Sequence, residues 1–435
     1  MKEQIQLFWF RRDLRLNDNC GLFYALDSGK KVLPIFIFDE DILSRLPDND
    51  ARVSFLHQEL ANINTQLNEI GTSLAVFHGK PIEIYKQLLE KYNVETVFTN
   101  HDYEPYALQR DATIKAFLET KNTSFKTYKD QVIFERNEIV KKDGTAYKVY
   151  TPYSKKWLEA FHHKGIQFFP SEEKLDGLVQ NTEHPFLSLG DIGFQPSTIK
   201  VASYKVSPKL IDAYEETRNF PAKDGTSRLG THLRFGTVSV REMVAKASKS
   251  NNIVFLKELI WREFFMQILW HYPHTTKDSF KPQYDRILWR NNEEEFKKWC
   301  AGETGYPLVD AGMRELNQTG FMHNRVRMLV GSFLCKHLLI DWRFGEAYFA
   351  EKLHDYEQSS NVGNWQWVAG CGVDAAPYFR IFNPTTQIQK FDKDLTYIKK
   401  WVPDFQELTY PAQMVDHKMA RERCLTTYKE ALNRT

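Results

Sequence analysis

The stretch IQLFWFRRDLRLNDN (residues 5–19) shows how the chain begins to fold. IQLFWF (5–10) is a short apolar run of the kind that forms a buried β-strand. The charged run FRRDLRLNDN (10–19) follows it directly, where a dinucleotide-binding fold would carry GxGxxG. The sequence also has no GxxxxGK[ST] motif, so it argues against an ordinary Rossmann dinucleotide site.

Outward from this strand, short apolar runs alternate with amphipathic stretches. Further strands are expected at 32–38, 73–78 and 94–100, with a less marked one at 125–129. Helical spacing fills the intervals at 50–70, 81–93 and 107–121. This βαβα order predicts an α/β domain with a doubly wound parallel sheet, which binds ligands beyond the carboxyl ends of its strands.

The pattern changes twice after the last predicted strand. Residues 130–195 are rich in turn-forming residues and predict a long connector across the surface. Beyond about residue 200 the spacing is helical, with helices expected at 238–248, 252–271, 292–300, 307–319, 322–339 and near 343–353. The predicted organisation is an α/β domain (1–130), an interdomain linker (131–198) and an all-α domain (199–435).

The composition fits a two-domain globular protein of the cytosol. The 435 residues are 42% hydrophobic, and no run is long enough to span a bilayer. The N-terminus lacks the apolar core and cleavage site of a signal peptide. The five cysteines are scattered and form no CxxC pair, which predicts free thiols and no metal site.

Charge and aromatic content bear on a nucleic-acid partner. The net charge is only +2, from 58 basic and 56 acidic residues, so a DNA site requires local clustering of Arg and Lys. Eight of the ten tryptophans lie beyond residue 260. This asymmetry suggests an unusual site in the second half, although large helical cores also use tryptophan.

The stretch KELIWREFF (257–265) places three functional side chains on one face of a predicted helix. Glu258 lies three residues before Trp261 and four before Arg262. The functional interpretation is a carboxylate and an indole that line one pocket. The alternative is a surface Glu–Arg pair beside a core tryptophan.

The helical stretch MHNRVRM (322–328) is similar. Asn324 and Met328 are four residues apart and face the same way, whereas Arg325 and Arg327 point to different sides. One arginine is then available to a DNA phosphate while the other pairs with a buried acid. The alternative is a polar helix face with a core methionine.

Two further segments have the composition of ligand-binding loops. In DGTSRLGTHLRFG (224–236), Thr226 or Ser227 is expected to cap the following helix, whose N-terminus is either a phosphate site or simply capped. NVGNWQWVAGCGVDAAPYFRIFNPTTQ (361–387) is nearly uncharged and dense in Gly, Asn and aromatic residues. Such a loop typically shapes a ligand cavity, the alternative being an aromatic core loop.

Together these segments resemble the photolyase/cryptochrome family, and within it the class I enzymes that repair cyclobutane pyrimidine dimers. The matching motifs, in order, are FRRDLRLNDN, GTSRL, ELIWREF, TGYPLVDAGMREL, HNRVRM, LLIDWRFGE, NWQW and DAAPYFRIFNPTTQ. They span essentially the whole chain. The resemblance implies an α/β antenna domain, a long linker and a helical domain that holds FAD in a folded form.

The resemblance assigns one set of residues to the flavin. Arg262 and Arg327 would flank it, Arg327 would pair with Asp355, and Asn361 would face flavin N5. Phe255 and Glu357 depart from relatives that carry Trp and Asp there. The residues expected to contact FAD are Tyr214, Thr226, Ser227, Arg228, Leu229, Gly230, Phe255, Glu258, Arg262, Asn324, Arg327, Asp355, Glu357 and Asn361.

A second set matches the lesion and DNA contacts of the family. Relatives that repair (6-4) photoproducts carry His at the positions of Asn324 and Met328, so the cyclobutane lesion is expected. The iron–sulfur branch needs four cysteine ligands near its C-terminus, and only Cys371 and Cys424 lie in the last hundred residues. The residues expected to bind the lesion or DNA are Glu258, Trp261, Arg262, Asn324, Arg325, Met328, Trp367 and Gln387.

The family mechanism implied here is driven by blue or near-ultraviolet light. The lesion leaves the duplex at a cost of a few kcal/mol and stacks on Trp261 and Trp367. Excited, reduced, anionic FAD passes an electron to the dimer, the ring opens and the electron returns. Glu258, neutral if burial favours that form, stabilises the charge on the dimer. The expected catalytic residues are Glu258, Asn361 and the electron-relay tryptophans Trp365, Trp342 and Trp289.

A second, light-harvesting chromophore is expected in the first domain. DARVSFL (50–56) and NHDYEPY (100–106) resemble the deazaflavin- or FMN-binding type, and Tyr106-Ala107 replaces the Asn-Glu pair of folate-binding relatives. Phe36, Arg52 and Asp102 are the candidate contacts. The alternative is an empty pocket.

Two other functions stay open at this point. A cryptochrome signals instead of repairing, but the complete lesion set and the lack of a long extension after residue 435 favour repair. A light-independent nucleotide-binding or transfer enzyme would carry no flavin. The expected protein is a cytoplasmic, nucleoid-associated monomer whose partner is DNA with cyclobutane dimers, without a membrane or obligate protein partner.

Overall fold

The structure, a computed structural model, describes residues 4–433, which group into two compact units. Unit 1 combines the chain up to Glu135 with Glu159–Tyr204 and Leu229–Lys249, and unit 2 holds Arg136–Leu158, Lys205–Arg228 and the chain from Ser250 onward. These units do not coincide with the domains expected from sequence. The domain limits 1–130, 131–198 and 199–435 stay a prediction.

Unit 1 is built on a five-stranded parallel sheet in the order β3-β2-β1-β4-β5. Each predicted strand is present: β1 (Gln4–Phe10), β2 (Val32–Asp39), β3 (Ala75–Gly79), β4 (Asn93–Asn100) and β5 (Ser124–Tyr128). The first strand lies in the centre, and the strand order reverses direction beside it. The predicted doubly wound topology is confirmed.

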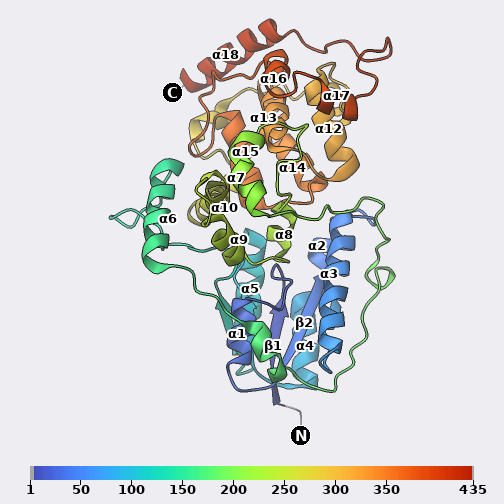
Figure 1. The fold of residues 1–435 in the computed structure, drawn as a ribbon, viewed down its shortest axis with the longest axis vertical. Coiled ribbons are helices and arrows are strands. Elements are labelled where there is room, and N and C mark those ends of the chain that lie inside the picture. Colours follow the sequence, from blue (N-terminus) through green and yellow to red (C-terminus); the bar gives the residue numbers. More distant parts are fainter. Residues whose placement is uncertain (1–3, 434–435) are drawn as a thin grey trace. The chain divides into compact units, whose positions relative to one another are not determined.

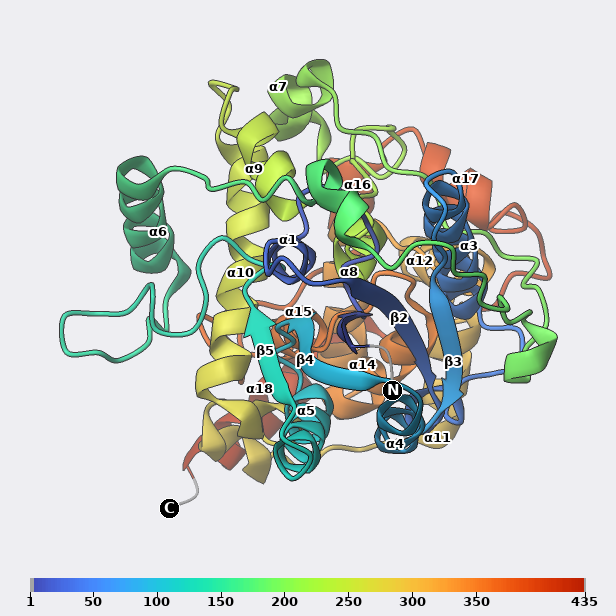
Figure 2. The ribbon, with the colours of Figure 1, turned by 90° about the horizontal axis from the view of Figure 1, so that it is seen from below.

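The side chains of β1 alternate between two hydrophobic cores, one on each face of the sheet. Phe8 and Phe10 pack with α1 (Cys20–Leu26) and α3 (Ala51–Asn68), whereas Leu7 and Trp9 pack with α4 (Pro81–Lys91) and α5 (Pro105–Glu119). Figure 2 shows these helix pairs on opposite faces. Because successive strand residues point to opposite faces, a strand that is apolar at nearly every position requires cover on both.

The charged run after β1 forms a buried ion-pair network. Arg241 Nε lies 2.8 Å from Asp18 Oδ2, and its Nη2 lies 2.8 Å from Asp130 Oδ1. Arg15 Nη2 lies 2.7 Å from Asp130 Oδ2. The four side chains are buried, so each charge requires its partners to remain favourable.

The same run also explains why residues 229–249 belong to unit 1. The N–H of Leu14 donates to the carbonyl of Phe235 at 3.1 Å, and Arg15 Nη1 donates to that of Gly236 at 3.0 Å. Gly236 has φ +66°, and a Cβ there would lie 2.1 Å from the carbonyl oxygen of Arg12. Only glycine permits this approach. The other α-helices wholly within unit 1 are α2 (Glu40–Leu43), α8 (Gly230–Phe235) and α9 (Val240–Ala247), and two short 3-10 helices lie at Ser171–Gly177 and Gly190–Ile192.

Unit 2 is helical, as predicted for the second part of the chain (Figure 1). The helices that carry predicted site residues are α7 (Pro208–Thr217), α10 (Val254–His271), α13 (Asn324–Ser332), α14 (Trp342–Lys352), α15 (Gln358–Ala369) and α16 (Pro384–Phe391). The others are α11 (Glu293–Ala301), α12 (Pro307–Thr319), α17 (Thr396–Trp401) and α18 (His417–Asn433). Among residues 4–433, none of these helices has the length and apolar character needed to cross a bilayer.

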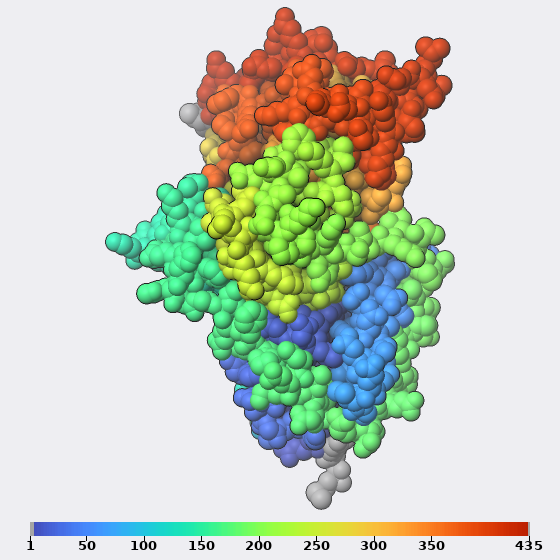
Figure 3. All heavy atoms as spheres, in the orientation of Figure 1, coloured from blue at the N-terminus to red at the C-terminus, as the bar shows by residue number. Residues whose placement is uncertain are grey.

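Three local predictions are wrong. The connector 130–195 contains the helix α6 (Tyr150–Lys164), with Tyr153 and Trp157 buried; Pro152 lies in its first turn, where a proline's missing N–H is tolerated. This part of the chain, teal to green, lies at the surface in Figure 3. Segment 361–387 begins inside α15 and ends inside α16 rather than being one loop. Neither Thr226 nor Ser227 caps a helix, because α8 follows Leu229 without a side-chain cap.

The predicted helix 322–339 is shorter than expected. It ends at Ser332 and continues as a π-helical turn, Phe333–His337. The other predicted helices lie within a few residues of their expected bounds, which is the usual precision for helix ends.

The network at Asp130 makes the stability of unit 1 depend on pH. Burial alone would raise the pKa of Asp130, but Arg15 and Arg241 lower it to about 2. Because an unfolded Asp has a pKa near 3.9, the charged form stabilises the fold above about pH 4 and this stability is lost as the pH falls towards 2. We expect Asp130→Asn to cost about 3–5 kcal/mol at neutral pH, measured by urea unfolding.

Glu69→Gln, at an exposed position after α3, is the matched control and should change little. An Asp130→Asn protein with the parent's unfolding free energy and the parent's acid sensitivity would contradict the assigned role of this network.

Candidate functional site

Helix α15 presents predicted site residues in two directions. Asn361 and Trp365 are four residues apart, share one side of the helix, and are 8% and 3% exposed. Trp367 is two residues beyond Trp365, about 200° around the helix, and is half-buried. The helical conformation therefore points the two tryptophans of WQW to opposite sides.

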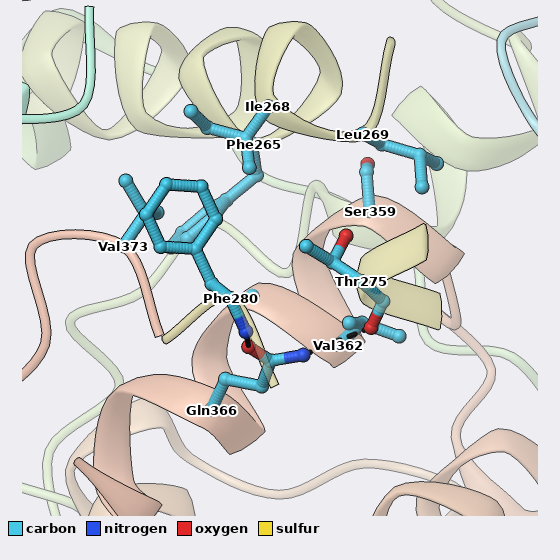
Figure 4. A pocket seen from close by; sticks show the side chains of 10 residues that line it. Phe265, Ile268, Leu269, Thr275, Phe280, Ser359, Val362, Gln366 and Val373 are labelled. Carbon is cyan, nitrogen blue, oxygen red and sulfur yellow. Dashed lines mark hydrogen bonds between the residues drawn. The ribbon is translucent and has the colours of Figure 1, made fainter. Parts of the chain in front are cut away.

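Gln366, between these tryptophans, fixes α15 to the segment 275–280. Its Nε2 donates to the carbonyls of Thr275 and Asp278 at 2.8 and 3.0 Å. Its Oε1 accepts from the N–H of Phe280 at 2.8 Å, the contact drawn in Figure 4. The residue is 1% exposed; its hydrogen bond to Thr275 is buried, and those to Asp278 and Phe280 are partly buried.

Helix α14 contacts the Asn361 side of α15. Asn361 Nδ2 donates to the backbone carbonyl and to Oε1 of Glu346, both at 3.0 Å. Burial raises the pKa of Glu346, and the bond from Asn361 opposes that rise. Gly345 lies against Trp365: a Cβ there would be 2.1 Å from the indole Cη2. The predicted flavin-facing amide and the first relay indole are thus held by one neighbouring helix.

The three predicted relay tryptophans belong to one hydrophobic core. Trp365 and Trp342 are buried in it, whereas Trp289 is half-buried and lies edge-to-face against Tyr428 at 5.9 Å. The set therefore runs from the core to a partly exposed indole. Electron transfer along it stays a prediction.

The side chains of Glu258 and Arg262 on α10 do not pair with each other, so the surface-pair alternative is wrong. Glu258 Oε1 accepts from Nη1 of Arg218, just after α7, at 2.5 Å. Arg262 Nη2 lies 2.9 Å from Glu357 Oε1 at the start of α15. Partial burial raises the pKa of Glu258, and the charge and hydrogen bond of Arg218 oppose the rise.

Trp261 is covered on one ring face by Tyr150. The two rings stack at 3.6 Å between centroids with 7° between planes. Tyr150 Oη donates to the carbonyl of Lys257 at 2.8 Å, and its backbone N–H donates to Asp374 Oδ2 at 3.0 Å. These contacts fix the orientation of Trp261 from a segment distant in sequence.

Arg325 and Arg327 have different surroundings, as the spacing on α13 predicted. Arg327 makes two hydrogen bonds to Asp355, at 3.1 and 2.9 Å, so the expected ion pair is present. Arg325 Nη2 donates to Asn219 at 2.5 Å, and its guanidinium lies 4.4 Å from the ring of Phe391 on α16. Gln387 is four residues before Phe391, so it lies on that side of α16. Along α13, Asn324 is exposed and Met328 half-buried.

His323, which caps α13, is buried among positive charges. It is 3% exposed, and its Nε2 has no hydrogen-bond partner among the described residues. Burial lowers its pKa to about 4, and the positive charges of Arg327, Arg325, Arg228 and Arg218 act in the same direction. Arginines converging on an unpartnered buried nitrogen suit a ligand that carries phosphate groups, so the residues present fit FAD.

The predicted nucleotide-binding residues belong to two units. In unit 2 the ring of Tyr214 lies edge-to-face against Phe255 at 5.1 Å, and burial raises its pKa to about 12. Arg228 has φ +52° and lies 4.5 Å from the ring of Phe321. Thr226 is half-buried, and the carbonyl of Ser227 accepts from Lys205 at 2.9 Å. Leu229 and Gly230 are part of unit 1 and begin α8.

The three antenna candidates in unit 1 each contact a different neighbour. Phe36 lies in the core edge-to-face with Phe38 at 5.0 Å, and Arg52 pairs with Asp50 at 2.6 Å. Asp102 lies 3.1 Å from Arg12, and the arginines around it lower its pKa in spite of burial. These contacts do not bring the three residues together, and their antenna role stays a prediction.

Four residues of the region were not predicted from sequence: Arg218, Tyr150, Phe379 and Arg380. Arg218 is four residues after Tyr214, a spacing that would have placed it on the same face. Phe379 is 61% exposed and followed by exposed Arg380, whose charge reaches Arg325. Both lie inside the aromatic segment 361–387. Tyr150 carried no signal, because its segment was interpreted as a connector.

A small cavity lies between α10 and α15, beside Gln366 (Figure 4). Its volume of about 10 Å³ is room for one water-sized molecule, and the buried hydroxyl of Ser359 on its wall has no partner within the described residues. It is too small for a flavin ring.

Comparison with known proteins agrees with this geometry. Residues 6–172 match the DNA photolyase family, and residues 255–409 match the FAD binding domain of DNA photolyase. A curated relative, the deoxyribodipyrimidine photo-lyase of Agrobacterium fabrum, is 36% identical over 97% of this chain and 97% of its own length. The chain belongs to the DNA photolyase family.

Solved structures of photolyases and of a cryptochrome share the fold. A bacterial class III photolyase from Agrobacterium tumefaciens superposes with a TM-score of 0.87 at 34% identity over 99% of this chain and 98% of its own. An archaeal photolyase from Sulfolobus tokodaii with two FAD molecules gives 0.84 at 31% identity over 98% and 100%. A Synechocystis cryptochrome gives 0.83 at 25% identity over 98% and 99%. The fold is therefore common to both branches, and the class I assignment stays a prediction.

The approach of α14 to Trp365 gives a test of the photolyase core. We expect Gly345→Ala to displace the indole, because the added methyl would lie 2.1 Å from its Cη2. Overpacking of this kind costs about 1–3 kcal/mol. Thermal unfolding measures the cost, and photoreduction of bound flavin measures whether the displaced indole still transfers electrons.

Ala347→Ser, at an exposed position of the same helix, is the control and should leave both measurements near the parent's. Parent-like stability and photoreduction in Gly345→Ala would show that this contact does not position Trp365.

Proposed function

We propose that the chain is a deoxyribodipyrimidine photo-lyase, which repairs cyclobutane pyrimidine dimers in DNA by light-driven electron transfer. The observation that carries the proposal is the arrangement around Glu258. A carboxyl with a raised pKa lies on the same helix face as Trp261, is bonded to Arg218, and adjoins a region of converging arginines. Such a site accepts a polar, flat and phosphate-linked ligand.

FAD would be held by the side chains that surround Asn361 and His323. When bound, reduced FAD supplies the absorption of light and the electron that opens the cyclobutane ring. Tyr214 and Arg228 would contact its ribose and phosphates, and Arg262 and Arg327 would flank its ring system. Both arginines are already oriented by acidic partners, Glu357 and Asp355, so binding requires little reorganisation.

The lesion would be held by groups from three helices. Flipping two bases out of the duplex costs a few kcal/mol, and stacking on an aromatic side chain returns about 1–3 kcal/mol per base. Trp261 on α10 and Trp367 on α15 would provide that stacking, with Asn324 and Met328 on α13 as further contacts. Arg325, Arg380 and Gln387 would meet the backbone beside the extruded bases.

Glu258 would donate a hydrogen bond to the pyrimidine while charge develops on it. Its raised pKa increases the population of the neutral, donating form, and Arg218 opposes this rise. In a partly dry site such a donor is worth more than in water. Glu258 thus contributes to catalysis, and Arg218 tunes it.

Several finer features belong to the same proposal. The protein would act as a cytoplasmic monomer without an obligate protein partner, associated with the nucleoid through DNA. Its first domain (1–130) would hold an antenna chromophore of the deazaflavin or FMN type rather than folate, and residues 131–198 and 199–435 would serve as linker and FAD domain. The photolyase from Sulfolobus tokodaii, which holds two FAD molecules, supports a second flavin-like chromophore.

Two measurements test the function. The absorption spectrum of the purified protein should show flavin, and blue light should restore normal bases in an oligonucleotide that carries one cyclobutane dimer. Flavin without repair would favour a cryptochrome, the fold of which is shared. A colourless protein that cannot be loaded with FAD would favour a light-independent nucleotide-binding enzyme.

Substitution of Glu258 tests the mechanism directly. We expect Glu258→Gln to retain part of the repair quantum yield, because the amide still donates, and Glu258→Ala to lose more. In the parent the yield should fall as the pH rises through the raised pKa of Glu258, since the neutral form is the donor. Glu258→Gln should remove this pH dependence.

Arg218→Gln provides the matched comparison. Because Arg218 lowers the pKa of Glu258, its removal should move the pH transition of the yield upward. Equal quantum yields in the parent, Glu258→Gln and Glu258→Ala would exclude Glu258 from the mechanism.

A further inference from the structure

Residues 136–158 of unit 2 are rich in positively charged side chains. The segment carries six Lys or Arg residues against two acids, a net charge of +4, whereas the whole chain has a net charge of +2. The rest of the protein is therefore slightly acidic. An excess of positive charge in one segment of a near-neutral chain is typical of segments that bind polyanions.

The chain builds an exposed turn from part of this segment. Val140 and Ala146 form an antiparallel bridge, and the N–H of Lys141 donates to the carbonyl of Thr145 at 2.9 Å. Gly144 has φ +80°, the left-handed conformation that such turns require. We call residues 140–149 the basic arm; Figure 2 shows it as the teal loop before α6 that extends away from α10 and α15.

Two cations of the arm, Lys141 and Lys142, are available to a ligand, whereas the third, Lys148, contacts aromatic rings. Lys141 and Lys142 are exposed at the turn, and among residues 4–433 neither forms an ion pair with a carboxylate. Asp143 follows the two lysines, and its Oδ1 accepts from the N–H and the hydroxyl of Thr145 at 3.0 and 2.7 Å. Lys155, on the following helix α6, is also exposed.

The base of the arm is anchored to the elements that carry the lesion tryptophans. The Lys148 ammonium lies 5.4 Å from the ring of Tyr272 and 5.8 Å from that of Phe280. Phe280 is bonded to Gln366, next to Trp367. Tyr150, directly after the arm, stacks on Trp261 at 3.6 Å. At the other end, the carbonyl of Ile139, directly before the arm, accepts from Nε2 of Gln267 on α10 at 2.6 Å. The arm is thus attached to helices of the proposed lesion site.

We infer that the basic arm binds the sugar–phosphate backbone of the DNA that flanks the lesion. This inference rests on the proposed function only for the identity of the polyanion. The tip of the turn is about five residues from the anchoring residue Lys148, so it reaches at most roughly 15 Å from that anchor. Phosphates of one strand recur every ~3.4 Å along the duplex axis, so this reach covers about four of them. Phosphate contacts carry no sequence information, so the arm adds affinity for damaged and undamaged DNA alike.

The salt dependence of binding tests the inference. Each lysine–phosphate contact contributes about 0.9 to the slope of log K against log salt concentration on duplex DNA. We expect Lys141→Gln/Lys142→Gln to reduce the slope by about 1–2, measured by fluorescence anisotropy with matched duplexes with and without one cyclobutane dimer. Affinity at low salt should fall by the same factor for both duplexes. The repair yield per bound dimer should not change.

The control is Lys418→Gln/Lys429→Gln, two exposed lysines of α18, which changes net charge by the same amount. A slope for the arm variant equal to the parent's, or a reduction matched by the α18 variant, would overturn the inference. If the parent repairs dimers but the arm variant keeps the parent's salt slope, only the inference about the arm is excluded. If the parent binds DNA through the arm but never repairs a dimer, only the proposed function is excluded.

Discussion

The orientation of the whole site depends on the buried side chain of Gln366. Its three hydrogen bonds to the backbone of residues 275–280 set the rotation of α15 about its own axis. That rotation decides where Asn361, Trp365 and Trp367 point, because each residue of a helix turns about 100° from the last. The tight approach of Gly345 to Trp365 fits only one such rotation. Position 366 is therefore structural, although it lies between two residues of predicted function.

The charges of the site separate into two groups. Arg262 and Arg327 are paired with Glu357 and Asp355, which holds their guanidinium groups in place. Arg325 and Arg228 contact aromatic rings instead. Their charges act on His323 together with those of Arg327 and Arg218, which are themselves paired with acids. Paired arginines suit the orientation of a ring system, and uncompensated ones suit phosphate. One small region thus provides both kinds of contact that a flavin nucleotide and a DNA backbone require.

Most of the fold was predictable from the sequence, because its strands and helices follow local patterns of hydrophobic residues. The five strands are apolar runs of ordinary length, and long amphipathic stretches predicted most of the helices that carry the site. What failed depends on tertiary context. WQW has the composition of a loop, yet α15 forms because its residues pack against α10 and α14. Tyr150 functions through a stack on Trp261, more than a hundred residues away, which no local pattern reveals. The pairing of Glu258 with Arg218 instead of Arg262 likewise depends on where α7 packs.

The network around Asp18 and Asp130 has a consequence for biosynthesis. Arg241 completes it, yet this residue leaves the ribosome about 110 residues after Asp130. At 5–20 residues per second this interval is on the order of ten seconds. During this interval all five strands have been synthesised, but Asp18 and Asp130 still lack the counter-charge of Arg241. The sheet is then a nascent intermediate, and a ribosome pause or truncation before position 241 would leave it exposed to chaperones and proteases.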